Sequence, residues 1–231
     1  MLILKLLIII YILYTIRYIT NILQYNSTAS IITIHIPNKD KITNELKLKQ
    51  PLHILFPENK LNITIHTMNK IIPGYIIKDN DSLISLDQLS KSDTIHIYKN
   101  KFIINDYNLI NHVSDTYDYF NSPFNCGKSS YISLYRGNQS IPLTKNYKEH
   151  LLFQPLYGNV TFYLFNPKHE TDIKGVESIK KWAIKIEIKQ DHVLFIPPEW
   201  LYLYECSDEW ILSQTEYDTY FSYIFNYIRQ K

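Results

Sequence analysis

The first 19 residues form an almost unbroken apolar run, MLILKLLIIIYILYTIRYI, whose only charged residues are Lys5 and Arg17. As a helix, 19 residues extend about 28 Å, close to a hydrocarbon core of about 30 Å. The pattern predicts a hydrophobic helix within residues 1–24 that anchors the chain in a membrane through residues 1–19, as a single-pass protein. A signal peptide that is cleaved near Ala29 is the alternative, and it would make the protein secreted.

Residues 30–105 alternate between apolar and polar positions, which predicts a β-rich amino-terminal region. The strand-like runs are 31–36, 53–56, 62–66 and 93–98. A Thr-Ile-His triplet recurs at Thr33, Thr64 and Thr94, so the three histidines would share a sheet face if all these runs were strands. Three neighbouring histidines suit zinc, but a solvated sheet face explains the pattern more simply.

Residues 106–231 form a second predicted domain, which is also mainly β. A short helix with its loop is predicted at 106–120, and strands at 131–135, 151–154, 160–165, 183–189, 193–196 and 201–204. Near the carboxy terminus, apolar residues recur with a helical period at Tyr217, Tyr220, Phe221, Ile224 and Ile228. This spacing predicts a helix over 215–229 whose apolar stripe packs on the core or joins two copies as a homodimer.

The charge balance argues against a nucleic-acid partner. The 231 residues carry 24 basic and 22 acidic side chains, with no long basic tract. Isoleucine, asparagine, lysine and tyrosine are abundant, while alanine occurs only at Ala29 and Ala183. This bias is typical of an AT-rich genome, and it makes short asparagine- or isoleucine-rich motifs weak indicators of function.

Two further features bear on the compartment. Glycosylation sequons occur at Asn26, Asn62, Asn80, Asn138 and Asn159, and they permit a lumenal body. The only two cysteines, Cys126 and Cys206, cannot form a zinc site alone. They are expected either to remain free thiols or, in an oxidising lumen, to pair.

Residues 190–202, QDHVLFIPPEWLY, combine a turn, a buried strand, a Pro-Pro break and a second strand. This segment resembles the last core segment of the JmjC/cupin-like family of double-stranded β-helix proteins. Upstream, residues 137–146 and 151–167 resemble two further segments of that family in the same order. The resemblance covers about residues 130–215, and it implies a double-stranded β-helix in the carboxy-terminal domain.

The same resemblance questions enzymatic activity. Active family members hold Fe(II) with two histidines and one carboxylate and also bind 2-oxoglutarate. At the three ligand positions this chain has Thr144, Asn146 and Tyr202. Val160 occupies the position of the lysine that binds 2-oxoglutarate in many members, and His150 a position that often lines the pocket. An apolar side chain cannot hold the 2-oxoglutarate anion, and a neutral phenol is a poor ligand for Fe(II).

The sequence thus predicts a membrane-anchored, catalytically degenerate JmjC/cupin-like protein without a cofactor. It would act as a binding or scaffolding module for an unidentified protein partner, through a vacated pocket lined by Thr144, Asn146, His150 and Tyr202. One alternative is an oxygenase that uses Fe(II) and 2-oxoglutarate with unorthodox ligands. Another is a structural surface or secreted glycoprotein.

Overall fold

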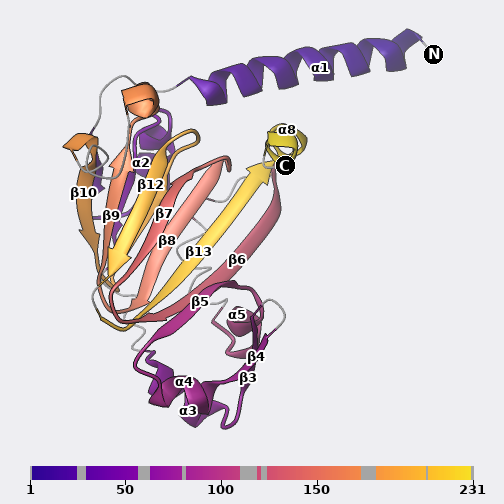
Figure 1. Ribbon diagram of the computed structural model, residues 1–231. Coiled ribbons are helices and arrows are strands. Elements are labelled where there is room, and N and C mark those ends of the chain that lie inside the picture. Colours follow the sequence, from indigo (N-terminus) through magenta and orange to yellow (C-terminus); the bar gives the residue numbers. More distant parts are fainter. Residues whose placement is uncertain are drawn as a thin grey trace.

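The computed structural model describes residues 2–24, 30–56, 63–79, 82–109, 119–120, 124–172, 181–206 and 208–229. Its first element, α1 (Leu2–Leu23), is a 22-residue helix that projects from the body of the molecule (Figure 1). None of its described side chains is buried, and the stretch Ile3–Asn21 is long and apolar enough to cross a membrane. The predicted apolar helix is confirmed, and it is compatible with an anchor or with a signal sequence.

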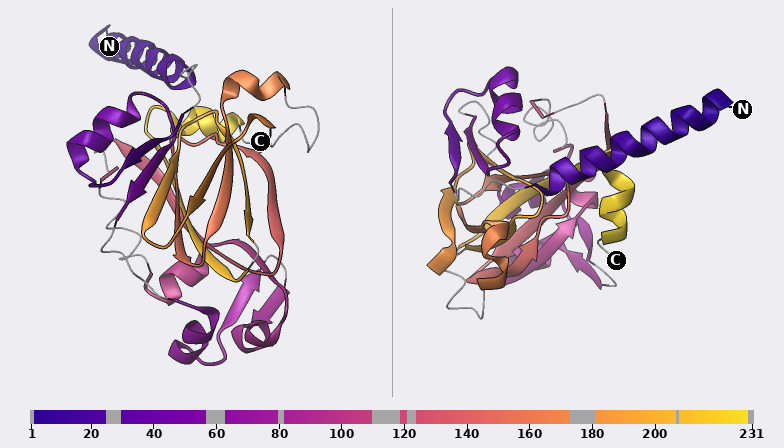
Figure 2. Two further views of the ribbon diagram at one scale, coloured as in Figure 1. Left: turned by 90° about the vertical axis from the view of Figure 1, so that its left-hand side faces the viewer. Right: turned by 90° about the horizontal axis from the view of Figure 1, so that it is seen from above.

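The body is a mixed α/β fold built on two sheets that are antiparallel apart from the β1–β2 pair (Figures 1 and 2). The larger sheet contains, in spatial order, β1 (Ile32–Ile34), β2 (Leu52–Leu55), β11 (His192–Ile196), β8 (His150–Tyr157), β13 (Trp210–Thr219), β6 (Asn125–Arg136) and β5 (Ile95–Asn100). The smaller sheet contains β10 (Ile184–Ile188), β9 (Val160–Phe165), β12 (Leu201–Cys206) and β7 (Gln139–Lys145). In the described part of the chain the sheets do not close into a barrel.

Between β6 and β13, consecutive strands lie in different sheets, except that β9 and β10 pair within the smaller sheet. From β6 to β9 the chain alternates between the larger and the smaller sheet, and it alternates again from β10 to β13. Each sheet therefore receives four of these eight strands. The strands predicted at 160–165 and 201–204 are confirmed as β9 and β12.

Aromatic side chains fill the space between the sheets. The members of this inter-sheet core include Tyr135, Phe153, Phe162, Trp200, Tyr202, Tyr204 and Trp210, which are all at most 3% exposed. They alternate along their strands with residues that face outward, as expected where a strand has two different environments. The turn that joins β8 to β9 also approaches this core closely. Gly158 has φ +75°, and a Cβ there would lie 2.6 Å from the Glu209 carbonyl oxygen, which is why only glycine fits.

The amino-terminal region extends the larger sheet at both edges. β2 pairs with β11, and β5 pairs with β6, so residues 30–105 and 106–231 share one sheet. Helix α2 (Lys39–Leu46) packs on one area of this sheet through Ile42, which clusters with Ile34 of β1 and Ile54 of β2. A lobe at the lower end in Figure 1 combines α3 (Ile65–Ile71), β3 (Ile76–Asp79), β4 (Ser82–Ser85), α4 (Leu86–Lys91) and α5 (Phe102–Asp106).

The predicted helix over 215–229 is wrong in its first half. Residues up to Thr219 belong to β13, which is paired with β6 on one side and β8 on the other. Only α8 (Tyr223–Arg229) is helical. Tyr217 is fully buried while Tyr220 is 61% exposed, so they do not share a stripe. The hydrogen bonds of β13 to two neighbouring strands stabilise the extended conformation more than the helical spacing of apolar residues favours a helix. The spacing alone therefore gave a wrong prediction.

The strand predicted at 62–66 is also wrong in its described residues, 63–66. Thr64 caps helix α3, because its hydroxyl accepts from the Thr67 amide and the Thr67 side chain accepts from the Thr64 amide. His66 therefore lies on a helix, and β1 and β5 lie at opposite edges of the larger sheet. The three triplet histidines are not on neighbouring strands. The helix predicted at 106–120 falls largely outside the described residues, and α5 ends at Asp106.

Candidate functional site

The candidate site lies where the resemblance places the metal centre, between β7 and β12 of the smaller sheet. Thr144 and Tyr202 are direct partners in the pairing of these strands, so their side chains share a face. Thr144 donates its hydroxyl to the Pro142 carbonyl oxygen at 2.9 Å. Tyr202 points into the inter-sheet core, with its ring 5.4 Å from that of Phe153. The structure thus brings these two predicted residues together.

The Tyr202 phenol is held neutral. Burial raises the pKa of Tyr202 well above its ordinary value, and the nearby Tyr98 and Glu216 raise it further. A metal ligand of this type must lose its proton to bind well. Tyr202 therefore acts as an aromatic core residue and does not replace the histidine of the resembled family.

Asn146 is committed to structural hydrogen bonds. Its side chain is buried, and its Nδ2 donates to the carbonyl oxygens of Ile196 at 2.8 Å and Pro197 at 3.0 Å. Its Oδ1 accepts from the Lys148 amide at 2.8 Å, and its main chain pairs with Trp200 and Glu199. The amide thereby fixes the Pro-Pro turn between β11 and β12. An ionised carboxylate could not donate to the two carbonyl groups, so these hydrogen bonds require the amide of asparagine at this position.

Val160 and His150 do not complete a ligand set. Val160 is fully buried in the inter-sheet core. His150 lies on the opposite face of the larger sheet, the face of Leu152, where its ring stacks on that of Tyr217 at 4.4 Å. Burial lowers the pKa of His150, and its Nδ1 has no hydrogen-bond partner among the described residues. The four side chains therefore do not converge on one pocket, although a shared pocket was predicted for Thr144, Asn146, His150 and Tyr202.

The polar groups that do face the space between the sheets were missed by the sequence analysis. They are Tyr98, Lys99, Tyr131, Gln214 and Glu216, the inter-sheet polar cluster. Gln214 and Glu216 follow the core residue Leu212 on the same face of β13. Gln214 Nε2 donates to Glu216 at 3.3 Å, and Lys99 Nζ lies 3.7 Å from Glu216. The ammonium group also lies 5.6 Å from the centre of the Tyr131 ring.

This cluster is suited to binding rather than to redox chemistry. The Lys99 side chain is 28% exposed and that of Glu216 is 13% exposed, so both are reachable from solvent. Burial raises the pKa of the Tyr98 and Tyr131 phenols, which keeps them neutral donors and acceptors. A ligand with its own charged and hydrogen-bonding groups would find complementary partners here. Residues 213–216 of β13 are an unbroken polar run, which does not mark a strand face, and Glu216 was read as part of the helix predicted over 215–229.

A second polar cluster lies where α1 meets the body. Glu149 accepts hydrogen bonds from the Ser222 hydroxyl at 2.6 Å, from the Thr219 hydroxyl at 2.9 Å and from the Thr219 amide at 3.2 Å. The Tyr18 hydroxyl of α1 donates to the same carboxylate. Beside it, the fully buried Asp218 accepts from Asn226 and forms an ion pair with Lys148. Both carboxylates are satisfied, so this cluster fastens elements together.

A cleft of about 830 Å³ lies at the other end of the sheets, away from Asn146. Its lining includes Asn159, Glu187, Asp191, Glu205, Asp208 and Glu209. Because carboxylates outnumber its one basic residue, Lys189, the cleft disfavours an anion such as 2-oxoglutarate. Among the described residues, no three His, Cys, Asp or Glu side chains are grouped so as to hold a metal ion.

The two thiols cannot pair. The Cys206 Sγ lies 3.9 Å from the Gly137 carbonyl oxygen, just beyond one end of β6. Cys126 lies near the other end of that strand, about 35 Å away at 3.3 Å per residue. Disulfide formation needs Cα atoms within about 7 Å. Both cysteines are therefore free in this fold.

A histidine pair on the outer edge gives the protein a predicted pH response. His53 Nε2 and His192 Nδ1 are 2.9 Å apart on the adjacent strands β2 and β11. Burial lowers the pKa of His53 to about 4, and His192 and His35 lower it while Asp191 opposes them. The folded state therefore disfavours the protonated form that the unfolded chain takes up below about pH 6.5.

Stability is expected to fall as the pH drops from about 6.5 to 4, with a His53 contribution of about 1 kcal/mol after solvent screening. Thermal unfolding of the wild type and of His53→Gln at pH 7 and pH 4.5 isolates that contribution. The variant should lose less stability on acidification than the wild type. An equal loss in both proteins would show that His53 titrates normally.

Comparisons with protein-family models and with curated proteins find no match for this chain.

Proposed function

We propose that this protein is a membrane-anchored, catalytically degenerate member of the JmjC/cupin-like type that binds or scaffolds a partner. One observation carries the proposal. Asn146, at the position of the resembled family's carboxylate ligand, donates to two carbonyl oxygens, and Tyr202, at the position of one of its two histidine ligands, packs among aromatic rings. The residues present do not fit Fe(II), so Asn146 and Tyr202 have structural roles at positions where active members of that family carry a metal.

The strand arrangement supports the double-stranded β-helix part of the proposal. Strands β6 to β13 are eight in number, four in each of two facing sheets, with repeated crossings between the sheets. Two facing sheets of four strands each are the usual arrangement of jelly-roll and cupin folds. The amino-terminal strands then extend the larger sheet at its two edges.

The inter-sheet polar cluster is the proposed contact region for the partner. It offers a paired ammonium and carboxylate, Lys99 and Glu216, between tyrosine rings. Such a set can recognise a polar peptide side chain by hydrogen bonds while the rings contact its apolar part. An unidentified protein is the partner that this chemistry suits best.

Contacts between α1 and the body favour retention of the helix over cleavage as a signal peptide. Lys49 donates to the Asn21 carbonyl oxygen, and its Nζ also lies 3.1 Å from Asn21 Oδ1. The Tyr18 hydroxyl is bound to Glu149. A segment that is removed from the mature protein has no need of specific contacts with it. We therefore propose a retained membrane anchor.

A thermal-shift experiment on the full chain in detergent micelles tests the loss of the metal site. Mn(II), as a redox-stable substitute for Fe(II), and 2-oxoglutarate are added separately and together. A ligand at 100 times its Kd would stabilise the native state by about 2.7 kcal/mol. No rise of the unfolding midpoint is expected in any condition. A joint rise that disappears in Tyr202→Phe would support the oxygenase alternative instead.

The glycoprotein alternative is favoured by a separate observation. Asn138 and Asn159 are exposed in the turns that precede β7 and β9, where an oligosaccharide could be attached. The sequons at Asn26 and Asn62 lie outside the described residues, as does the one at Asn80. A mass decrease after glycosidase treatment of the chain made in eukaryotic cells, absent in Asn138→Gln/Asn159→Gln, would place the body in a lumen.

A further inference from the structure

The end of the body beside α1 exposes an unusual number of large apolar side chains. They are Phe124, Tyr220, Tyr223, Tyr227 and Ile228, here called the tyrosine surface, and they are 41% to 66% exposed. Four of the five come from α8 and the turn before it, and Phe124 is tied to that turn because the Tyr220 amide donates to its carbonyl oxygen at 3.0 Å. Isolated exposed apolar residues are ordinary, but a contiguous set calls for an explanation.

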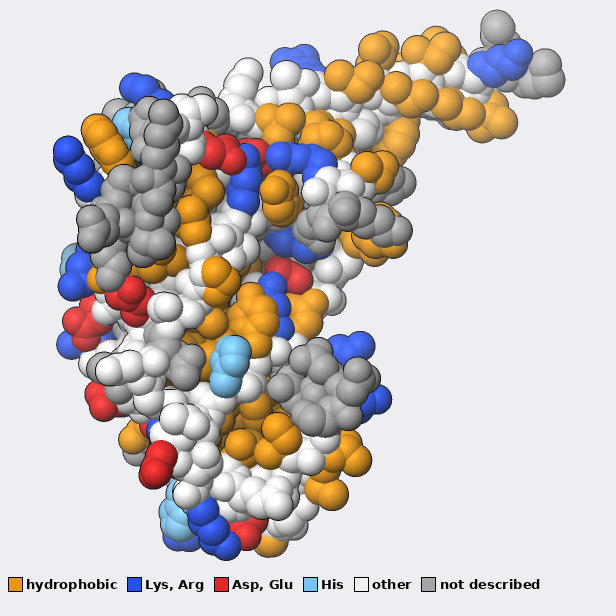
Figure 3. Space-filling view, viewed as in Figure 1, with side chains coloured by type: hydrophobic (Ala, Val, Ile, Leu, Met, Phe, Trp, Pro, Cys, Tyr) orange, Lys and Arg blue, Asp and Glu red, His pale blue; other side chains and the backbone are white. Residues whose placement is uncertain are grey.

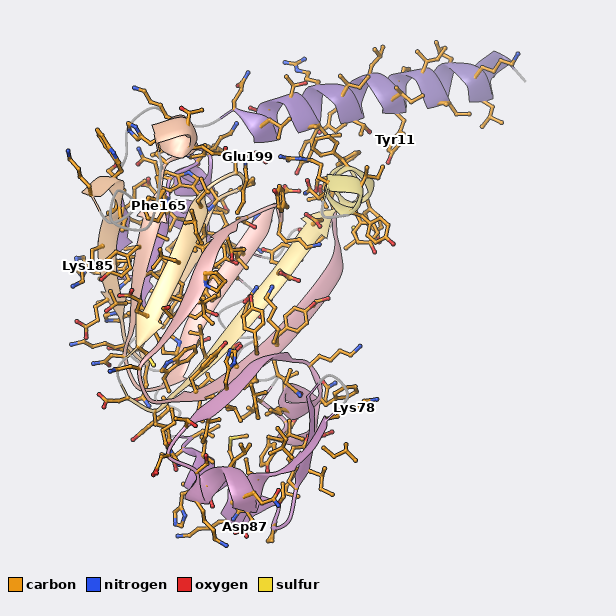
Figure 4. The ribbon with its side chains drawn as sticks, viewed as in Figure 1. Tyr11, Lys78, Asp87, Phe165, Lys185 and Glu199 are labelled. Carbon is orange, nitrogen blue, oxygen red and sulfur yellow. The ribbon has the colours of Figure 1, made fainter. Side chains whose placement is uncertain are left out.

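The tyrosine surface is continuous with α1. The Phe221 ring lies 5.9 Å from that of Tyr11, 5.0 Å from that of Tyr14 and 5.3 Å from that of Tyr18. On its other side, Phe221 lies 5.9 Å from Phe124. Figure 4 labels Tyr11 on the side of α1 that faces α8, and Figure 3 shows apolar side chains along α1 and beneath it. Any bilayer that receives α1 is therefore brought next to the tyrosine surface.

The chemistry of the surface suits the boundary between lipid and water. Tyrosine is enriched there, because its ring prefers the apolar side and its hydroxyl the headgroups. Between Tyr220 and Arg229 the sequence has one charged residue, Arg229, whose guanidinium is paired with Glu199 at 2.6 Å and 3.0 Å. The surface thus presents no unpaired charge from α8 that would oppose insertion into the headgroup layer.

We infer that the tyrosine surface and the adjoining side of α1 seat together in the interfacial layer of one bilayer, and so fix the orientation of the body. This inference rests on the proposed membrane anchoring and adds a second, separate contact to it. The lobe that carries Asp87 then points away from the membrane, because it lies at the opposite end of the body from α8 (Figures 1 and 4). The lobe remains accessible to a soluble partner.

Tryptophan quenching in vesicles tests the inference on the full chain. The background variant is Trp182→Phe, because Trp182 is 44% exposed whereas Trp200 and Trp210 are buried. Tyr227→Trp reports on the tyrosine surface. Phe102→Trp is the matched control, since Phe102 is 46% exposed on α5 in the opposite lobe. Leu13→Trp reports on α1. Each chain is reconstituted into phosphatidylcholine vesicles whose acyl chains carry bromine near the headgroups.

The inference predicts that bromine lowers the emission of Tyr227→Trp and Leu13→Trp about twofold and leaves that of Phe102→Trp unchanged. Quenching of Leu13→Trp alone would overturn the inference while the anchor stands. Quenching of none of the three would overturn the anchor itself. An unquenched, blue-shifted Tyr227→Trp in a chain that sediments as a dimer in detergent would assign the surface to a second copy, and would likewise overturn the inference.

Discussion

Replacing Asn146 by Asp is expected to destabilise the protein rather than to create a metal site, although it supplies the carboxylate that the resembled JmjC/cupin-like family has at this position. The new carboxylate would be buried and would face the carbonyl oxygens of Ile196 and Pro197, to which the amide now donates. An uncompensated buried charge costs about 3–5 kcal/mol. For a chain of this length the midpoint of thermal unfolding should fall by about 10 °C.

Two controls separate this mechanism from a general effect of added charge. Asn138→Asp makes the same substitution at an exposed turn position and should change the unfolding free energy by less than about 0.5 kcal/mol. The loss in Asn146→Asp should also shrink as the pH falls and the introduced carboxyl group takes up a proton, since it can then donate one hydrogen bond. Equal stabilities of the two Asp variants at pH 7 would contradict the structural role of Asn146.

Replacing Glu149 by Ala is expected to lower the unfolding free energy by about 3 kcal/mol, because hydrogen bonds to a charged group are worth about 1.5–3 kcal/mol each. The change removes the acceptor of the Ser222 hydroxyl, the Thr219 hydroxyl and the Thr219 amide, all of which belong to buried residues. It also releases the Tyr18 hydroxyl, which joins α1 to the body. Thermal unfolding in detergent micelles measures the loss.

A double-mutant cycle tests whether α1 takes part in this cluster. Tyr18→Phe should cost about 1 kcal/mol in the wild type and clearly less in Glu149→Ala, where the Thr219 hydroxyl at 3.3 Å is the remaining partner of Tyr18. Additive effects of the two changes would show that Tyr18 does not bind Glu149 in solution. In that case Tyr18 would not hold α1 against the body, and the retention of α1 would lose its main support.

The parts of the fold that were predictable from sequence are those with strong local patterns. The apolar run of α1 and the alternation of Val160–Phe165 identified a helix and a strand without any knowledge of the tertiary structure. The end of the chain was not predictable in this way. Tyr217 and Phe221 have a helical spacing, yet pairing of β13 with two neighbours makes the first of them a strand residue.

The candidate site was predictable in part. The family resemblance put Thr144 and Tyr202 in one pocket, and the structure pairs them on the neighbouring strands β7 and β12. His150 was assigned to the same pocket from its position in the sequence alone. A shift of one residue along a strand turns a side chain to the opposite face of the sheet. In the structure, His150 faces away from the inter-sheet space. Lys99 belongs to the inter-sheet polar cluster because β5 pairs with β6. This pairing joins distant segments of the chain, so no local sequence pattern indicates that Lys99 lies there.

The metal content of the purified full chain tests the central claim most directly. The protein is expressed with added iron, purified without oxygen in the presence of 2-oxoglutarate, and its iron is measured against protein concentration. Because Thr144, Asn146 and Tyr202 stand at the proposed ligand positions, the proposal predicts far less than one iron per chain. One iron per chain, lost in Tyr202→Phe while the variant remains folded, would contradict the assignment of a catalytically degenerate site.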